Sequence, residues 1–273
     1  MSFNPDSPPP SPDAGPGDVQ DNTPAAWLDD LRVAAIFFTR VPIQRDGALE
    51  LGNLARAWRV VPAIGVSIGL AGAIVYFLAY GLGLPALAAA ILAVLTTALV
   101  TGALHEDGLS DFADGSGGDS AERRIEIMRD SRIGAFGTLA LIFSVGLRVA
   151  ALAAIAKPMA VILALIVAHA VSRAAIPVAM DRMTPAAPLG LGAGAGTPDR
   201  TSVVIAAITA GALALILLGV GPGVAALIAA GLAAFAMAAA AERLLGGFTG
   251  DVLGAVQQAA EAAVLLACAA TLV

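Results

Sequence analysis

From Val60 to Leu104 the chain carries no charged residue, and this run limits the fold more than any other feature. It is long enough for two helices of about 20 residues, the length that crosses the hydrocarbon core of a bilayer. Glycine and proline within residues 81–85 predict the turn between them. Composition agrees, since 58% of the residues are hydrophobic and 13% are charged. The sequence therefore predicts a membrane protein.

Further apolar segments follow the first run, over residues 136–156, 158–180, 202–219, 223–243 and 252–273. Backbone polar groups that face lipid must be bonded within their own segment, so each of these segments is expected to be a helix. The expected fold class is all-α, a polytopic membrane helix bundle with about seven transmembrane helices.

The N-terminal part is expected to be organised differently. Residues 1–24 are rich in Pro, Ser and Asp and contain no cation, which predicts a disordered tail before a membrane-embedded domain over residues 25–273. The apolar stretch Val33–Phe38 is too short to cross a bilayer, so we expect an interfacial or re-entrant helix with Arg40 at its polar end. A surface anchor without a functional part is the alternative.

The cations predict an orientation. With seven spans and the N-terminus inside, most arginines fall on one side of the membrane and only Lys157 falls on the other. The positive-inside rule then places the loops over residues 105–135 and 181–200, together with the turn LLGGFTGD, in the cytoplasm. Arg148 and Arg173 remain within spans, where an arginine either snorkels to the interface or faces a partner.

Residues 105–115 read HEDGLSDFADG and concentrate acid in a chain that otherwise avoids charge. Asp107, Asp111 and Asp114 are spaced i, i+4, i+7, so on a helix they share one face. Carboxylates so close together normally have a cation to neutralise them or have raised pKa values, and oxygen ligands favour a hard ion such as Mg²⁺. His105 is a candidate general base or ligand, although helical geometry points it away from the three Asp. The alternative is a solvated acidic loop.

A second amphipathic segment, AERRIEIMRDSRIG, continues the polar character. It offers Glu126 and Asp130 as further metal ligands, and Arg129 and Arg132 as groups that could bind phosphate. Ordinary ion pairing along a helix explains the same pattern equally well.

The third element is the segment GGFTGDVLGAVQQAAE. Gly246, Gly247, Thr249 and Gly250 predict a loop, and Asp251 begins the last span, whose N-terminal backbone amides would suit a phosphate. Glu261 lies further along the same helix, at a depth where a carboxylate is a functional candidate, as is Arg173 in the fourth span. Clustered Asp, several Arg and a Gly-rich turn together indicate metal-assisted phosphoryl transfer.

The motifs, taken in order, resemble those of cobalamin synthase, the adenosylcobinamide-GDP ribazoletransferase family. They are FFTRVPI, VVPAIGVSIG, HEDGLSDFADG, RIEIMRDSRIGAFGTLAL, AVSR and GGFTGDVLGA. The resemblance runs from about residue 35 to the last span. It departs from the family at Gln258, where an acid is often found, so that Glu261 is the acid left on that face.

The resemblance implies a specific reaction. A ribose hydroxyl of α-ribazole, or of its 5′-phosphate, attacks the cobinamide-linked phosphorus of adenosylcobinamide-GDP, and GMP leaves. It also implies Mg²⁺ dependence and a bacterial inner-membrane location, and it makes residues 25–273 a catalytic domain. With the orientation that the cations predict, the active face would be cytoplasmic. By position the family motifs fall on His105, Asp107, Asp111 and Asp114, on Glu126 to Ser131, and on Thr249, Gly250 and Asp251.

The implied partners are these substrates and membrane lipids, with no nucleic acid. Small residues are abundant in every span, which is compatible with a homo-oligomer. A CDP-alcohol phosphotransferase is the nearest enzyme alternative, but Asp111 and Phe112 stand where its motif requires Ala and Arg. A small ion or solute transporter is the alternative from another class, and it would spread charged groups along the spans.

Overall fold

The computed structural model describes residues 23–44, 51–186 and 196–273, and these ranges are helical apart from short connections and one isolated bridge. The elements in chain order are α1 (Pro24–Phe38), α2 (Leu51–Ala57), the 3-10 helix η1 (Trp58–Val60), α3 (Val61–Gly81), α4 (Ala86–Thr101), α5 (Leu104–Gly115), α6 (Ala121–Met128), α7 (Ala135–Ile155), α8 (Pro158–Arg182), α10 (Arg200–Leu218), α11 (Val220–Leu245) and α12 (Gly250–Leu272). The all-α prediction is confirmed. Most of residues 1–24, the predicted tail, lies outside the described residues.

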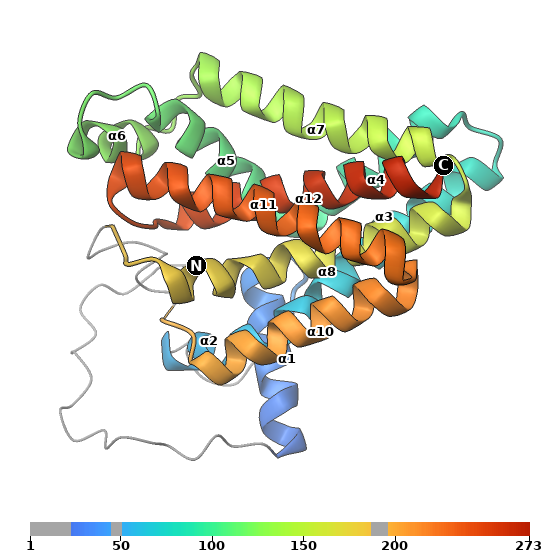
Figure 1. The fold of residues 1–273 in the computed structure, drawn as a ribbon, viewed down its shortest axis with the longest axis horizontal. Coiled ribbons are helices and arrows are strands. Elements are labelled where there is room, and N and C mark those ends of the chain that lie inside the picture. Colours follow the sequence, from blue (N-terminus) through green and yellow to red (C-terminus); the bar gives the residue numbers. More distant parts are fainter. Residues whose placement is uncertain (1–22, 45–50, 187–195) are drawn as a thin grey trace.

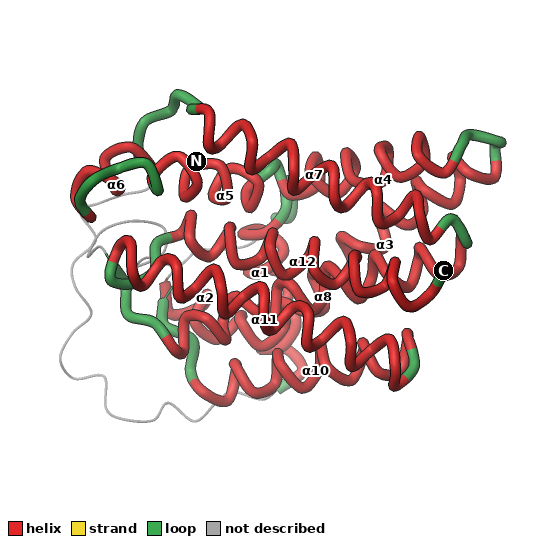
Figure 2. Tube along the Cα trace, turned by 45° about the horizontal axis from the view of Figure 1, so that its top comes forward, coloured by secondary structure: helices red, strands yellow, loops and turns green. Residues whose placement is uncertain are grey.

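Six helices in the described ranges are long and apolar enough to cross a membrane, and a seventh span results if α4 and α5 are counted together. The continuous run Leu54–Gly81, which ends in α3, is the first of them, followed by α7, α8, α10, α11 and α12. The prediction of about seven spans is therefore confirmed. The long helices lie side by side along the long axis of the molecule, and most loops lie at its two ends (Figure 2).

The predicted second span is where structure and sequence differ. The charge-free run continues to Leu104, but α4 ends earlier, at Thr101. Gly102 and Ala103 then adopt left-handed backbone conformations, with φ of 65° and 56°, and the chain turns by 90° into α5. With 16 residues, α4 is about 24 Å long, shorter than a typical hydrocarbon core. The bend turns α5, with its His, Glu and Asp residues, away from the direction of α4.

Helix α1 runs across the long helices, as Figure 1 shows, and it is not one of the candidate spans. Its Asp30 is fully buried and accepts hydrogen bonds from the Nε of Arg59 at 2.6 Å and from the Nε of Arg56 at 2.8 Å. The Arg59 guanidinium also lies 4.0 Å from the centre of the Trp27 ring. These contacts fix α1 against η1, and so set the position of the aromatic residues at the end of α1.

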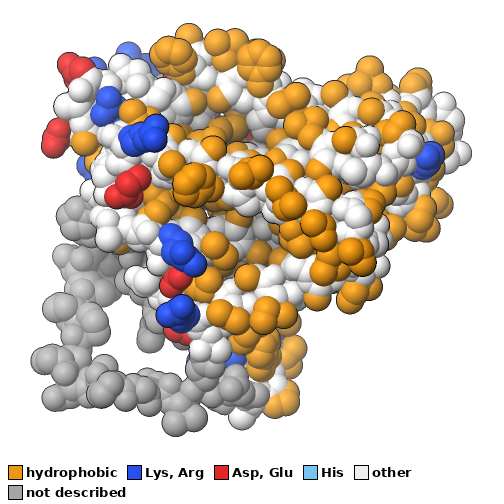
Figure 3. All heavy atoms as spheres, viewed as in Figure 1, with side chains coloured by type: hydrophobic (Ala, Val, Ile, Leu, Met, Phe, Trp, Pro, Cys, Tyr) orange, Lys and Arg blue, Asp and Glu red, His pale blue; other side chains and the backbone are white. Residues whose placement is uncertain are grey.

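Charged side chains gather at one end of the molecule (Figure 3). This polar end contains α5, α6 and the turn between α11 and α12 (Figure 1). Residues 184–186 join it, because the backbone of Phe248 pairs with Thr184 and Ala186 through two hydrogen bonds of 2.9 Å. The predicted grouping of these segments on one side is confirmed for the described residues. Lys157 lies at the opposite end, where its Nζ donates to the Leu272 carbonyl at 3.1 Å.

Candidate active site

The site is built where α5 crosses the start of α12. A Cβ atom added at Gly108 would lie 2.9 Å from the Cα of Asp251, and one added at Gly254 would lie 3.1 Å from the His105 carbonyl. The two helices therefore touch backbone to backbone, and any larger residue at these crossing points would separate them. This close approach brings Asp107 of α5 next to Asp251 of α12.

The start of α12 is fixed by its own caps. Gly246 ends α11 with a left-handed φ of 71°. Thr249 is the N-cap of α12, and its side chain accepts a hydrogen bond from the Val252 amide at 3.3 Å. The prediction of a loop followed by the last span is confirmed, and α12 begins at Gly250, one residue before the predicted start at Asp251. Asp251 thus lies in the first turn, where a helix N-terminus favours negative charge.

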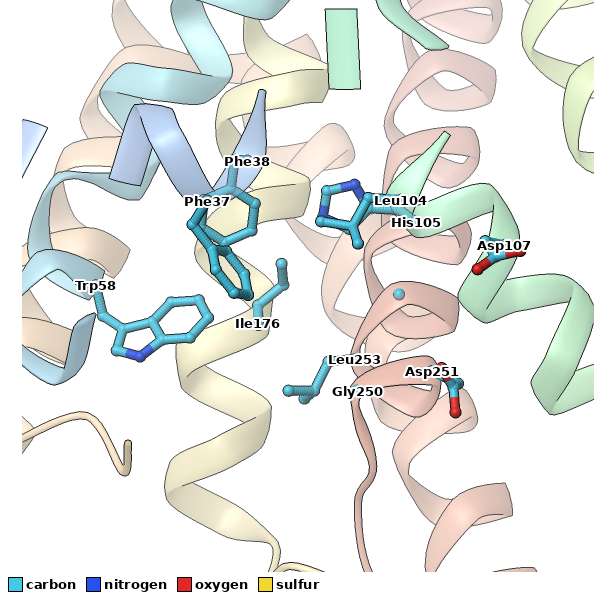
Figure 4. A pocket seen from close by; sticks show the side chains of 11 residues that line it. Phe37, Phe38, Trp58, Leu104, His105, Asp107, Ile176, Gly250, Asp251 and Leu253 are labelled. Atoms are coloured by element: carbon cyan, nitrogen blue, oxygen red, sulfur yellow. The ribbon is translucent and has the colours of Figure 1, made fainter. Parts of the chain in front are cut away.

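A pocket opens beside this crossing, and α1, η1, α5, α8 and α12 contribute to it. Its lining residues are Phe37, Phe38, Trp58, Leu104, His105, Asp107, Ile176, Gly250, Asp251, Leu253 and Gly254. In Figure 4 the rings of Phe37, Phe38 and Trp58 lie on one side, Asp107 and Asp251 lie on the other, and His105 lies between them. We call Asp107 and Asp251 the acidic pair.

Neither member of the acidic pair has an ion-pair partner among the described residues. The Asp107 side chain is exposed and that of Asp251 is half-buried. Asp111 lies near both. Burial, followed by the charges of Asp107, Asp251 and Asp114, raises the pKa of Asp111 to about 6. Carboxylates that raise one another's pKa in this way favour the binding of a cation between them.

The donor set fits a magnesium ion only in part. Among the residues the structure describes, no group of three His, Cys, Asp or Glu side chains is close enough to hold a metal ion by itself. The acidic pair does supply hard oxygen donors, and Mg²⁺ is commonly held by one or two carboxylates together with substrate phosphates and water. The arrangement therefore fits an ion that binds together with a phosphorylated substrate.

The three Asp share one face of α5, as predicted, but their carboxylates meet different neighbours. Asp107 lines the pocket, whereas the carboxylate of Asp114 accepts hydrogen bonds from the amides of Gly134 at 2.7 Å and Gly137 at 2.8 Å. Asp114 therefore caps the start of α7 and links it to α5. Its predicted role in metal binding stays a prediction, as does that of Asp111. His105 points toward Phe38, away from the Asp residues, as helical geometry predicted.

The predicted site residues of the second motif lie at the surface, whereas Arg124 of the same motif is half-buried and donates to the Leu244 carbonyl at 2.9 Å. Glu126 accepts a hydrogen bond from Arg123 at 2.6 Å, and Asp130 pairs with Arg132 at 2.6 Å. The hydrogen bonds from Arg132 lower the pKa of Asp130 to about 2. None of these side chains, nor exposed Arg129 and Arg40, lines the pocket. Local ion pairing accounts for the contacts of Glu126, Asp130 and Arg132. The roles of these residues, and of Arg129 and Arg40, in binding metal or substrate stay predictions.

A second cluster of charge is buried behind the pocket, between α5, α7, α8 and α12. This buried ionic network consists of Glu106, Arg148, His169, Arg173 and Glu261. The Nη1 atom of Arg148 lies 3.1 Å from Glu106 Oε1 and 3.0 Å from Glu261 Oε1. Glu261 Oε2 lies 3.1 Å from the Nδ1 of His169 and 3.9 Å from the Nη1 of Arg173. The network ties α5 to three long helices.

Polar side chains extend this network along α12. Gln257 donates to Glu261 at 2.7 Å and to Ser172 at 2.9 Å, and Ser144 donates to Gln258 at 2.9 Å. Gln258, the departure from the family motif, is therefore a buried hydrogen-bonding residue. Arg173 and Glu261, both predicted to bind substrate, lie in this network and not in the pocket lining. Arg148 is 1% exposed, so it faces partners and does not snorkel.

Glu106 and the aromatic lining of the pocket were not predicted from the sequence. Glu106 adjoins Asp107 in one acidic motif, and its partner Arg148 is 42 residues away, so no local pattern distinguishes the two acids. A signal did exist for Phe37 and Phe38. They end an apolar segment that is too short to span a membrane, directly before a Thr-Arg pair.

The fold and the pocket define a polytopic helical membrane protein with an acidic site at its polar end. The sequence matches the family described as Cobalamin-5-phosphate synthase over residues 30–269, and the chain belongs to that family. No solved structure matches it significantly.

Relatives named adenosylcobinamide-GDP ribazoletransferase extend over most of the chain. The Bradyrhizobium diazoefficiens protein is 51% identical over 245 residues, which is 89% of this chain and 94% of the relative. The Azorhizobium caulinodans protein is 47% identical over 249 residues, which cover 88% of this chain and 94% of the relative. The Mesorhizobium japonicum protein is 43% identical over 251 residues, which cover 92% of this chain and 96% of the relative. The resemblance seen in the motifs is confirmed, and the phosphotransferase and transporter alternatives are not favoured.

Proposed function

We propose that this chain is an adenosylcobinamide-GDP ribazoletransferase. A ribose hydroxyl of α-ribazole, or of its 5′-phosphate, attacks the phosphorus attached to cobinamide and forms a new P–O bond. The P–O bond to the second phosphate breaks, and GMP leaves with that electron pair. The observation that supports this reaction best is the acidic pair, unpaired by cations in the described residues, opposite an aromatic lining in a chain of this family.

Asp107 and Asp251 would hold a Mg²⁺ ion in this reaction. When bound, the ion would neutralise charge on the phosphate oxygens of the nucleotide substrate. The amides in the first turn of α12, which follow Thr249, would bind a further phosphate oxygen. Arg40, Arg129 and Arg132 are exposed, so they could reach a phosphate only at the outer side of the pocket.

His105 is the side chain we assign to the hydroxyl proton. It lies between the aromatic side of the pocket and the acidic pair (Figure 4). Its Nε2 atom is buried and makes no hydrogen bond with any described residue. An imidazole with an unused ring nitrogen can accept a proton from a hydroxyl brought within hydrogen-bond distance.

We further propose that the protein resides in the bacterial inner membrane with the polar end in the cytoplasm. The positive-inside rule supports this orientation, because the arginine-rich segments share one end of the molecule. Exposed leucine, isoleucine and phenylalanine side chains on the long helices would contact lipid. A homo-oligomer is compatible with this arrangement.

Turnover by the purified protein tests the proposal. The full chain in lipid nanodiscs should convert adenosylcobinamide-GDP and α-ribazole to adenosylcobalamin and GMP, and a chelator should abolish the reaction until Mg²⁺ is restored. Asp107→Asn should lower kcat on the order of 100-fold or more. Glu122→Gln, an exposed change on α6, is the matched control and should keep full activity. Folded wild-type protein that forms no product would refute the proposal.

A further inference from the structure

Aromatic rings form one continuous side of the pocket, which we call the aromatic wall (Phe37, Phe38, Trp58 and His105). The ring centres of Phe38 and His105 are 5.7 Å apart, and the rings are nearly parallel, at 7°. Phe38 also meets Trp58 edge to face at 5.7 Å, and Phe37 meets Phe38 in the same way at 4.9 Å. Three elements supply this wall, α1, η1 and α5.

The chemistry of the wall selects for one kind of ligand group. Leu104, Ile176 and Leu253 complete this side of the pocket. Among the described residues that line it, His105 and Trp58 are the only ones on this side whose side chains carry a hydrogen-bonding group. A flat, apolar ring would gain stacking and apolar burial here. A guanine base has donors and acceptors along its edge, and burial without partners would cost their hydrogen bonds to water.

We propose that the aromatic wall binds the base of the riboside substrate, an apolar benzimidazole ring, and not the guanine of the nucleotide. This inference rests on the proposed function, because it assigns one of its two substrates to one part of the pocket. With the base against the wall, the ribose lies beside His105 and its hydroxyl faces the acidic pair. The guanine and the corrinoid would then lie toward the open, polar side.

Tryptophan fluorescence tests binding without any turnover. The chain has two tryptophans, and Trp58 lines the pocket while Trp27 does not. In a Trp27→Phe variant, α-ribazole added alone should quench the remaining Trp58 emission in a saturable manner, and GMP added alone should not. Quenching by GMP without quenching by α-ribazole would overturn the proposal, as would no response to either ligand from protein that turns over both substrates.

Steady-state kinetics test the same assignment with a side-chain change. Phe37 is half-buried at the edge of the core, and within the described residues its one ring contact is Phe38. Phe37→Ala therefore removes pocket surface and leaves the fully buried side chains of the core in place. We expect the KM for α-ribazole to rise about tenfold or more, with less than a twofold change in the KM for adenosylcobinamide-GDP. Phe143→Ala, on the exposed face of α7, is the matched control and should change neither KM.

The methyl groups of the base sharpen this test. Each methyl removed from the benzimidazole riboside should raise KM about fourfold in the wild type, because less apolar surface is buried. The effect should be smaller in Phe37→Ala. A Phe37→Ala variant in which only the KM for adenosylcobinamide-GDP rises would place the nucleotide or the corrinoid at the wall and overturn the proposal. If α-ribazole quenches Trp58 emission in protein with an unchanged wall but that protein forms no product, the result would count against the proposed function and leave the wall assignment standing.

Discussion

Glu106 and Asp107 are neighbours in the sequence and both carry a carboxylate, but the structure puts them in two different regions. Glu106 is 8% exposed and pairs with Arg148 in the buried ionic network. Asp107 lines the open pocket with Asp251 and has no ion pair within the described ranges. The buried network contains its own cations, whereas the acidic pair depends on a ligand to supply one. One region is therefore built for stability, and the other for binding.

This difference has a physical origin. A charge away from water is tolerated only when an opposite charge and hydrogen bonds replace the solvent. Arg148 meets that need for both Glu106 and Glu261, within 3.1 Å of each. At the polar end water and substrate remain in reach, so carboxylates there can stay unpaired until a cation arrives. Substitutions in the buried ionic network should therefore lower stability most, and substitutions in the acidic pair should lower activity most.

Removal of Arg148 should have the largest effect on stability. Arg148→Ala leaves two buried carboxylates without their shared partner, and we expect a loss of about 3 to 5 kcal/mol in the free energy of unfolding. Unfolding in detergent, followed by circular dichroism, measures it. The double variant Arg148→Met with Glu106→Gln should recover part of the loss, because Glu261 still contacts His169 and Arg173. Equal stability of wild type and Arg148→Ala would contradict the structural role of the network.

A substitution that separates α5 from α12 should have the second largest effect on stability. In Gly108→Ala the new Cβ would lie 2.9 Å from backbone atoms of Asp251, which cannot yield as a flexible side chain would. We expect a loss of about 1 to 3 kcal/mol together with reduced turnover. Gly146→Ala on α7 is the matched control, since nothing lies within 4 Å of its added Cβ. It should be neutral or stabilising by up to about 1 kcal/mol. Equal effects at both glycines would show that the crossing is not tightly packed.

Asp114 distinguishes a capping role from a metal-binding role. Asp114→Ala removes the acceptor for the amides of Gly134 and Gly137, and the expected loss is about 1 to 2 kcal/mol, as for other helix caps. If capping is its main role, kcat should change by less than about fivefold at saturating Mg²⁺, far less than in Asp107→Asn. A rise in the Mg²⁺ concentration needed for half-maximal activity would instead return Asp114 to the metal site.

The exposed pairs of the α6 region should have the smallest effect. Asp130→Asn breaks a surface contact with Arg132, whose side chain is 86% exposed. Isolated pairs of this kind contribute about 0 to 1 kcal/mol, so neither unfolding nor turnover should change measurably. A large rise in the KM for adenosylcobinamide-GDP in this variant would restore the predicted role of this segment in binding substrate.

The sequence predicted the fold better than it predicted the site. Spans such as α7 and α8 could be placed from hydropathy, because a helix in lipid must be apolar along its length and bonded within itself. The bend after Thr101 could not, since the apolar run continues past it to Leu104. Spacing predicted one face for Asp107, Asp111 and Asp114, but spacing does not say which neighbour each carboxylate meets.

The sequence by itself determined that this chain is a bundle of membrane helices with its acids and arginines at one end, and its ordered motifs identified the family. Those properties follow from hydropathy and local periodicity. Only the tertiary structure decided which carboxylates pair with a cationic side chain and which ones line the pocket without such a partner among the described residues. That depends on contacts such as Arg148 with Glu106 and Gly108 with Asp251, which join residues distant in the chain. Such contacts exist only once α5 has turned and packed against α12.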